Sequence, residues 1–141
     1  MPSLRAAGLL DTFITSGQAF GGELETVTIW TGLLAAVERV GADVVIVADG
    51  PGNLGTDTTW GVSALASGHA LNAAETLGGR PVAALRISFA DERERHRGVS
   101  HHSLTILDRV CKVAANVAVP VLDGPEAGQF LGRGVINDLT R

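Results

Sequence analysis

Apolar residues occur in short uninterrupted runs that alternate with longer stretches of helical periodicity. The clearest run, residues 44–48, stops abruptly at the glycine-rich segment 49–55. This pattern predicts a buried parallel strand that delivers a flexible loop to the edge of a sheet. Weaker strand patterns, rich in β-branched and other apolar residues, occur at residues 9–15, 80–88 and 116–122.

Helical periodicity fills the intervals between these runs. The first helix is predicted at residues 23–40, with two glutamates in its first turn and Gly41 as its stop. The second runs from about residue 58 to residue 77, carries many small residues and ends at a pair of glycines. The third covers residues 104–114, after Ser100, which can cap its N-terminus.

The alternation of four strands with three helices predicts the fold class. With right-handed crossovers it indicates an α/β domain with a three-layer, Rossmann-like architecture, in which helices cover both faces of a mainly parallel sheet. The chain of 141 residues is expected to form one domain, residues 1–141. The polar or glycine-rich loops after the first three strands then share one sheet edge, where open α/β sheets bind ligands.

Composition narrows the class of protein. Apolar residues make up 45% of the chain and charged residues 18%, which favours a globular domain with part of its surface covered by a second copy of itself. The net charge of −4 argues against non-specific nucleic-acid binding. One cysteine, Cys111, excludes an internal disulfide and fits a reducing cytoplasm. We therefore expect a cytoplasmic homodimer with no nucleic-acid partner. We also expect no membrane partner, because no membrane-length apolar run or signal pattern occurs.

The glycine loop is the first candidate for ligand binding. Gly50, Gly52 and Gly55 match the dinucleotide spacing G-x-G-x-x-G after a predicted strand. Pro51 removes one amide, however, and the acid near the end of the next strand, Asp91, comes later than the fingerprint requires. A Walker-type phosphate loop is excluded, because no lysine follows the last glycine. The loop favours an anionic or polar ligand over NAD, with a purely structural turn as the alternative.

Reactive side chains are densest in residues 91–102, which hold three acids, three arginines and three of the four histidines. In one interpretation the arginines clamp an anion, a histidine or Asp91 transfers a proton, and Ser100 lies where helix N-terminal amides stabilise negative charge. In the other, the segment is a solvated charged loop and Ser100 is an ordinary helix cap. We favour the site, because this loop and the glycine loop are expected at the same sheet edge.

His96, His101 and His102, together with Asp91, are also candidates for metal binding. Adjacent histidines in one helical turn are expected to point in different directions, and no familiar zinc spacing occurs, so we predict no metal ligand. Cys111 lies on an apolar helix face and is predicted to be a buried, inert thiol.

Several segments resemble a bacterial family known as a domain of unknown function, number 3866. They are QAFGG at 18–22, GPGNLGT at 50–56, LNAA at 71–74, LGGRP at 77–81, RISFAD at 86–91 and RHRGVSHH at 95–102. The resemblance covers nearly the whole chain except its tail. It implies that the chain is the carboxyl-terminal part of a longer architecture, and it supplies no activity. Gln18 stands where a histidine is usual in that family, and Asp57 where a glycine is usual.

We expect the domain to bind a small anionic or nucleotide-like ligand at the carboxyl edge of its sheet, as a candidate enzyme of undefined cofactor. The alternatives are a non-catalytic homo-oligomeric assembly or regulatory module, and a metal-dependent hydrolase. The proposed proton-transfer residues are Asp91, His96 and His101. The proposed ligand-binding residues are Gly21, Gly22, Gly50, Gly52, Asn53, Gly55, Thr56, Ser88, Arg95, Arg97, Ser100 and His102.

Overall fold

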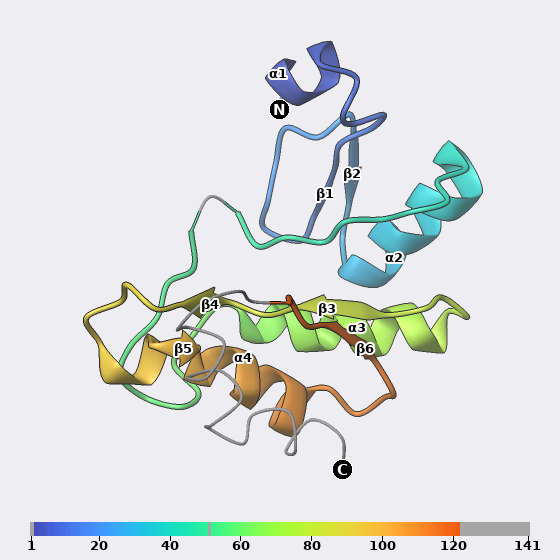
Figure 1. The fold of residues 1–141 in the computed structure, drawn as a ribbon. Coiled ribbons are helices and arrows are strands. Elements are labelled where there is room, and N and C mark those ends of the chain that lie inside the picture. Colours follow the sequence, from blue (N-terminus) through green and yellow to red (C-terminus); the bar gives the residue numbers. More distant parts are fainter. Residues whose placement is uncertain (1, 51, 122–141) are drawn as a thin grey trace. The chain divides into compact units, whose positions relative to one another are not determined.

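The computed structural model describes residues 2–50 and 52–121 (Figure 1). The chain divides into two compact units, Met1–Gly50 and Pro51–Arg141. The glycines and proline of the tail, residues 123–141, predict turns or a short irregular helix, and this segment lies outside the described residues.

The first unit contains a short helix, a pair of strands and a longer helix. Helix α1 (Pro2–Ala6) precedes strand β1 (Ile14–Ser16), which pairs in parallel with β2 (Leu24–Thr26). Helix α2 (Ile29–Leu34) continues directly into the π-helical segment η1 (Ala35–Val40).

The boundaries of this longer helix follow from local residue chemistry. Thr28 caps its N-terminus in a reciprocal arrangement with Thr31, so the helix begins at Ile29 and not at Glu23 as the periodicity predicted. The sequence Leu-Glu-Thr before this cap alternates apolar and polar side chains and forms β2 instead. Gly41, at φ +76°, ends the helix as predicted, because this left-handed conformation suits glycine.

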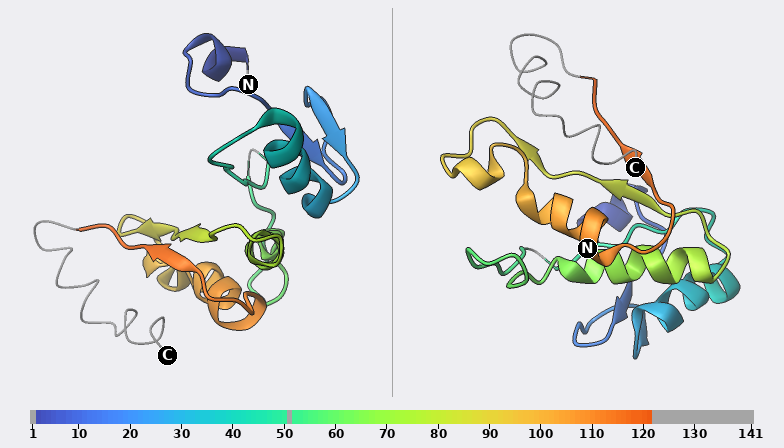
Figure 2. Two further views of the ribbon diagram at one scale, coloured as in Figure 1. Left: turned by 90° about the vertical axis from the view of Figure 1, so that its right-hand side faces the viewer. Right: turned by 90° about the horizontal axis from the view of Figure 1, so that it is seen from below.

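The second unit is built from short strands around two adjacent helices (Figure 2). Strand β3 (Val82–Ala84) pairs in parallel with β6 (Asn116–Ala118), and β4 (Ile87–Ser88) pairs antiparallel with β5 (Gly98–Val99). The helices are α3 (Leu65–Thr76), the 3-10 turn η2 (Glu94–His96), and α4 (His101–Thr105), which continues into the π-helical η3 (Ile106–Val110).

Helix α3 packs side by side with the α4–η3 helix (Figures 1 and 2). A methyl group placed on Gly68 would lie 2.6 Å from a methyl carbon of Val110, so the missing side chain allows the two helices to approach. The Asn72 side-chain amide stabilises this contact. It donates a hydrogen bond to the carbonyl oxygen of Val110 at 3.0 Å and accepts one from the Lys112 backbone N–H at 2.8 Å. Ile106, on the same helix, is buried with Val62 and Ala64.

The predicted three-layer, Rossmann-like fold is wrong. Within the described residues each sheet has two strands, and one of the three pairs is antiparallel. The run at 44–48, predicted as a central buried strand, is unpaired, and Val44 and Ile46 are 79% and 86% exposed. An apolar run specifies a tendency to be covered, whereas a sheet also needs a neighbouring backbone to complete its hydrogen bonds.

The strand predicted at 80–88 is interrupted for a similar reason. After β3 the backbone of Arg86 turns to the start of α4, where its N–H donates to Ser103 Oγ at 3.1 Å and its carbonyl accepts the Ser100 N–H at 2.9 Å. The chain therefore changes its pairing partner here, since β3 pairs with β6 and β4 pairs with β5. This break positions the residues that follow it beside the N-terminus of α4. Within the described ranges, 2–50 and 52–121, no helix has the length and apolar character needed to cross a membrane.

Replacing Gly68 with alanine tests the contact between the helices. Alanine favours an isolated helix by about 1 kcal/mol, but its methyl group would overlap Val110, and overpacking of this kind costs about 1–3 kcal/mol. We expect the free energy of unfolding to fall by about 1–2 kcal/mol in chemical denaturation. His69→Ala, at the exposed neighbouring position, is the control and should change stability by less than about 0.5 kcal/mol. A Gly68→Ala variant as stable as the natural chain would contradict the packing described.

Candidate functional site

The glycine-rich loop closes on itself as a small hairpin in the second unit. Gly55 and Val62 form an isolated antiparallel bridge, and the Thr56 N–H donates to the carbonyl oxygen of Gly61 at 2.8 Å. The Leu54 N–H donates to Ser63 Oγ at 3.1 Å. Two amides expected to cradle an anion are therefore used within the loop, and its contribution to a site comes from the side that faces α4.

A carboxylate, that of Asp91, holds two arginines of the same unit in place. Asp91 accepts hydrogen bonds from Arg86 Nη2 at 2.8 Å and from Arg93 Nε and Nη2 at 2.9 and 3.0 Å. It also accepts the Arg93 backbone N–H at 3.1 Å. These arginines hold the pKa of Asp91 well below its usual range, so it is ionised at neutral pH. The contacts favour a role in positioning the arginines over the proton transfer expected from the sequence.

Ser100 connects the three histidines of the cluster. Its side chain is fully buried and caps α4, with Oγ accepting the His102 N–H at 3.3 Å, as the sequence predicted. The same oxygen lies 2.8 Å from Nδ1 of His96, which comes from η2 and is 5% exposed. The cap therefore fixes one ring from η2 beside two rings, those of His101 and His102, from the first turn of α4.

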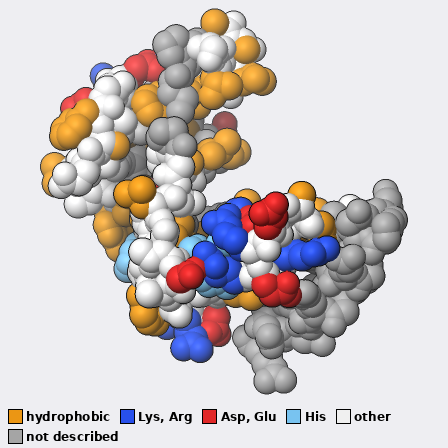
Figure 3. All heavy atoms as spheres, turned by 90° about the vertical axis from the view of Figure 1, so that its left-hand side faces the viewer, with side chains coloured by type: hydrophobic (Ala, Val, Ile, Leu, Met, Phe, Trp, Pro, Cys, Tyr) orange, Lys and Arg blue, Asp and Glu red, His pale blue; other side chains and the backbone are white. Residues whose placement is uncertain are grey.

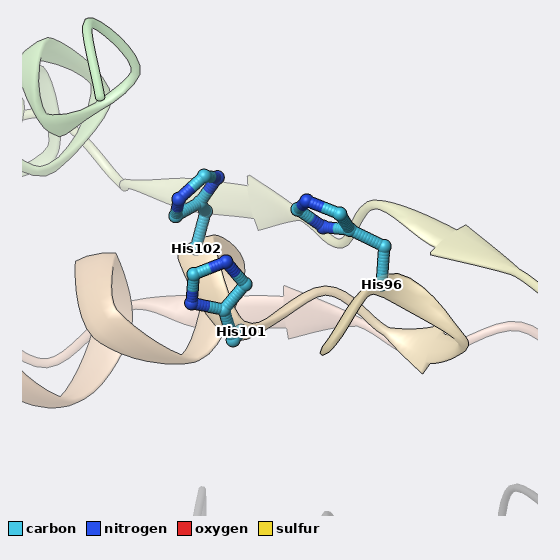
Figure 4. A group of neighbouring side chains, drawn as sticks. All are labelled: His96, His101 and His102. Atoms are coloured by element: carbon cyan, nitrogen blue, oxygen red, sulfur yellow. The ribbon is translucent and has the colours of Figure 1, made fainter. Parts of the chain in front are cut away.

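The three imidazole rings converge, as Figure 4 shows. The ring centroids of His101 and His102 are 3.9 Å apart, and His96 lies 5.0 and 5.2 Å from them. One nitrogen from each ring can be chosen so that all three lie within 4.8 Å of one another. The expectation that adjacent histidines would point in different directions is therefore wrong, since their side chains tilt together at the helix N-terminus.

Two of these rings have buried nitrogens without a hydrogen-bond partner. Within the part of the chain that the structure describes, Nε2 of His101 and Nε2 of His102 are buried and unpaired, and so is Nε of Arg95. Buried polar atoms are normally satisfied, so such a group indicates a site for a ligand, an ion or ordered water.

Burial also controls the protonation of the cluster. It lowers the pKa of His96, and the positive charges of Arg93 and Arg86 lower it further. Burial and the charge of Arg95 lower the pKa of His101. For His102 burial is again the main cause, followed by the two other histidines. The three rings are therefore predominantly neutral at pH 7, with lone pairs available for binding or for accepting a proton.

These groups surround a cavity of about 280 Å³ in the second unit. The basic and acidic side chains gather on one face of the surface, with histidine atoms visible beside the basic ones (Figure 3). The lining residues are Asn53, Gly55, Thr56, Val62, Ala64, Arg86, Arg93, Arg95, His96, Ser100, His102, Ser103 and Ile106. Arg95 lines the cavity while Nη2 of its guanidinium pairs with the carboxylate of Asp57.

The cavity unites only some of the residues predicted from the sequence. Asn53, Gly55, Thr56, Arg95, His96, Ser100 and His102 line it, and His101 contacts the rings of two of them. The lining does not include Gly52, Ser88, Asp91 or Arg97, and Arg97 is exposed.

The remaining predicted residues belong to the first unit, which contains Gly21, Gly22 and Gly50. There the Gly21 N–H donates to the Glu25 carboxylate at 2.8 Å, and the Gly22 N–H donates to the Thr15 hydroxyl at 3.3 Å. The first two glycines therefore use their amides within their own unit.

Sequence reasoning left Arg86, Arg93 and Ser103 out of the site, although all three line the cavity. A signal for Arg86 was present, because it is a charged residue inside the otherwise apolar strand pattern at 82–88. Ser103 carried no distinguishing pattern. Its role is evident only from the hydrogen bond that its hydroxyl accepts from the Arg86 backbone N–H.

The second unit thus combines helices and two-stranded sheets with a cavity lined by arginine and histidine side chains. The chain belongs to the DUF3866 family, a protein family of unknown function, whose model matches residues 1–138. No curated protein and no solved structure is significantly similar to the chain. The family resemblance carried by the glycine loop and the histidine segment is thus confirmed, and the cavity is where those two segments meet.

The lowered pKa values of the histidines predict a pH dependence of stability in chelator-treated protein. In the unfolded chain these rings titrate near pH 6.5, whereas in the folded chain they titrate at a lower pH. The unfolded state therefore binds more protons below pH 6.5, and the free energy of unfolding should fall as the pH is lowered through and below that value. Thermal melts from pH 7.5 to 5.0 should show a falling Tm, and NMR titration should give pKa values below 6.5. A Tm that rises on acidification across this range would contradict the burial described.

Proposed function

We propose that the second unit binds a small anionic ligand, such as a phosphate or carboxylate group, in the cavity between the glycine loop and the N-terminus of α4. The observation that supports it most is the convergence of three arginines, Arg86, Arg93 and Arg95, on a single cavity. Guanidinium groups bind phosphate and carboxylate through two parallel hydrogen bonds, and a partly enclosed cavity strengthens these bonds.

The ion pairs favour Arg95 as the principal anion-binding residue. Asp91 occupies Nε and Nη2 of Arg93 and Nη2 of Arg86, so these two side chains contribute mainly fixed positive charge. Arg95 pairs instead with Asp57, whose side chain is 78% exposed, and it retains a buried, unpaired Nε. An exposed carboxylate is easily replaced by another anion, because water already competes for the pair.

The dimensions and polarity of the cavity support a ligand of metabolite size. Its volume of about 280 Å³ lies near the lower end of the range for small-molecule sites. Asn53 and Thr56 add polar side chains at the glycine-loop side, and Val62 and Ile106 add apolar surface. This mixture suits a compact ligand with one charged group and an uncharged part. We further propose a cytoplasmic location, which the single cysteine supports.

Inorganic phosphate, added to chelator-treated protein at constant ionic strength, tests this proposal. Binding at ten times the dissociation constant stabilises a protein by about 1.4 kcal/mol, which corresponds to an increase of several degrees in Tm. Arg95→Gln should abolish this increase while leaving the Tm without phosphate nearly unchanged, since its ion pair lies at the surface. The result would be read by differential scanning fluorimetry and confirmed by calorimetry.

Arg97→Gln is the matched control, because it removes the same charge from an exposed arginine outside the cavity lining. It should retain the response to phosphate. A natural chain that is indifferent to phosphate and to small carboxylates, or an equal loss in both variants, would overturn the proposal.

A second function, homo-oligomeric assembly, is supported by a different observation. In the first unit several large apolar side chains are highly exposed, among them Val27 at 84%, Val44 at 79% and Ile46 at 86%. Large apolar side chains that are left exposed in this number favour an interface. We propose that this unit mediates the formation of a homodimer.

Light scattering coupled to size exclusion tests the assembly proposal. The natural chain should have twice the monomer mass of 14.6 kDa, and Ile46→Asp should shift it to the monomer, because burying an unpaired carboxylate opposes association. Val121→Asp is the control, since Val121 is 93% exposed but lies in the other unit. A monomeric natural chain at high micromolar concentration would contradict a dimer.

A further inference from the structure

We propose that His96, His101 and His102 form a binding site for a divalent transition metal, with Zn²⁺ as the best match, and that each histidine supplies one ring nitrogen. This site goes beyond the anion-binding function and does not depend on it. It revises the expectation from the sequence that no residue of this chain binds a metal. A metal site is also what the alternative function, a metal-dependent hydrolase, would require.

The geometry of the rings is close to that of a zinc site. Tetrahedral Zn²⁺ holds imidazole nitrogens at 2.0–2.1 Å, which places any two ligand nitrogens about 3.3 Å apart. In this structure one nitrogen from each of the three rings lies within 4.8 Å of the others. The three rings lie next to one another (Figure 4), and we expect side-chain rotations to close the difference.

The hydrogen bonds indicate which nitrogens are available. Nδ1 of His96 is 2.8 Å from Ser100 Oγ, so its Nε2 is the nitrogen left for a metal. Among the described residues, Nε2 of His101 and Nε2 of His102 are buried with no partner. A buried nitrogen without a partner is unfavourable by the energy of its lost hydration. A shared metal ion would satisfy all three lone pairs together.

Ser100 acts as a positioning residue in this arrangement. A histidine that binds metal through Nε2 carries its proton on Nδ1, and that N–H normally donates to a fixed acceptor. Ser100 Oγ can be such an acceptor for His96, and its position is fixed by burial and by the N–H of His102. A hydroxyl that accepts the Nδ1–H of His96 would hold this ring in the tautomer that a metal needs.

The surrounding charges are compatible with a cation, although three arginines line the same cavity. Asp91 pairs with Arg86 and Arg93, and Asp57 pairs with Arg95, so two carboxylates offset two of the three positive charges. Three neutral ligands leave a fourth coordination position for water or for an anion, which is the arrangement of catalytic zinc sites. An anion held by Arg95 can therefore also bind the metal, so phosphate should strengthen metal binding.

Metal titration of the full chain tests the site. Protein treated with chelator and then dialysed would be titrated with ZnCl₂ alone against a chromophoric chelator, and bound zinc would be counted by elemental analysis. We expect one Zn²⁺ per chain. His96→Ala and His102→Ala should each weaken binding by at least about 100-fold, because each removes a ligand. Ser100→Ala should weaken it by about 10–100-fold, as second-shell changes do.

His69→Ala is the matched control, since it removes the fourth histidine, which is exposed on α3 and outside the cluster. It should leave the affinity unchanged. Loss of binding in this variant, or equal binding by all variants, would overturn the proposal.

A spectroscopic measurement on the natural chain keeps the test independent of how well the variants fold. Co²⁺ in place of Zn²⁺ should give intense visible absorption bands typical of tetrahedral coordination, and added phosphate should shift them. Bands absent at stoichiometric Co²⁺ would overturn the metal site. A phosphate response in fluorimetry without any zinc binding would reject the metal site while leaving the anion-binding function standing.

Discussion

The organisation of the second unit depends on the hydrogen bonds of one buried residue, Ser100. Its backbone N–H donates to the carbonyl of Arg86, and its side chain caps α4 through the N–H of His102. The same oxygen bonds to His96. One residue thereby joins the β4–β5 pair, the η2 turn and the start of α4. A side chain with zero exposure and three such connections leaves little freedom to the groups around it.

Electrostatics divides the cavity into two regions with different roles. Around Asp91, fixed ion pairs keep Arg86 and Arg93 in place. Around the histidines, burial keeps the rings uncharged, and their nitrogens remain available. A region of fixed positive charge next to neutral Lewis bases is suited to a ligand that carries a negative charge and donates or coordinates at another point.

The sequence predicted local features well and the arrangement of the strands poorly. The Ser100 cap and the Gly41 stop were both correct, because each depends on a few neighbouring residues. The meeting of the glycine loop with the histidine segment was also predicted, although the reason given for it, a common edge of a large parallel sheet, is wrong. The pairing of strands depends on residues far apart in the chain, and short apolar runs such as 44–48 do not specify a partner. The convergence of the two adjacent histidines was missed, because spacing along a helix does not include rotamers at its first turn.

The anchoring of the far end of the α4–η3 helix by Asn72 determines which part of the cluster can adjust. The segments α4 and η3 form one continuous helix. Hydrogen bonds from Asn72 in α3 hold this helix near Val110, and it packs closely against α3 at Gly68, so the position of its first turn is restricted. His96 stands instead on the short η2 turn, joined to a β4–β5 pair of only two residues per strand. Because Ser100 also holds the ring of His96, any tightening of the cluster around a ligand would come from rotation of the His101 and His102 side chains, whose Nε2 atoms have no hydrogen-bond partner among the described residues.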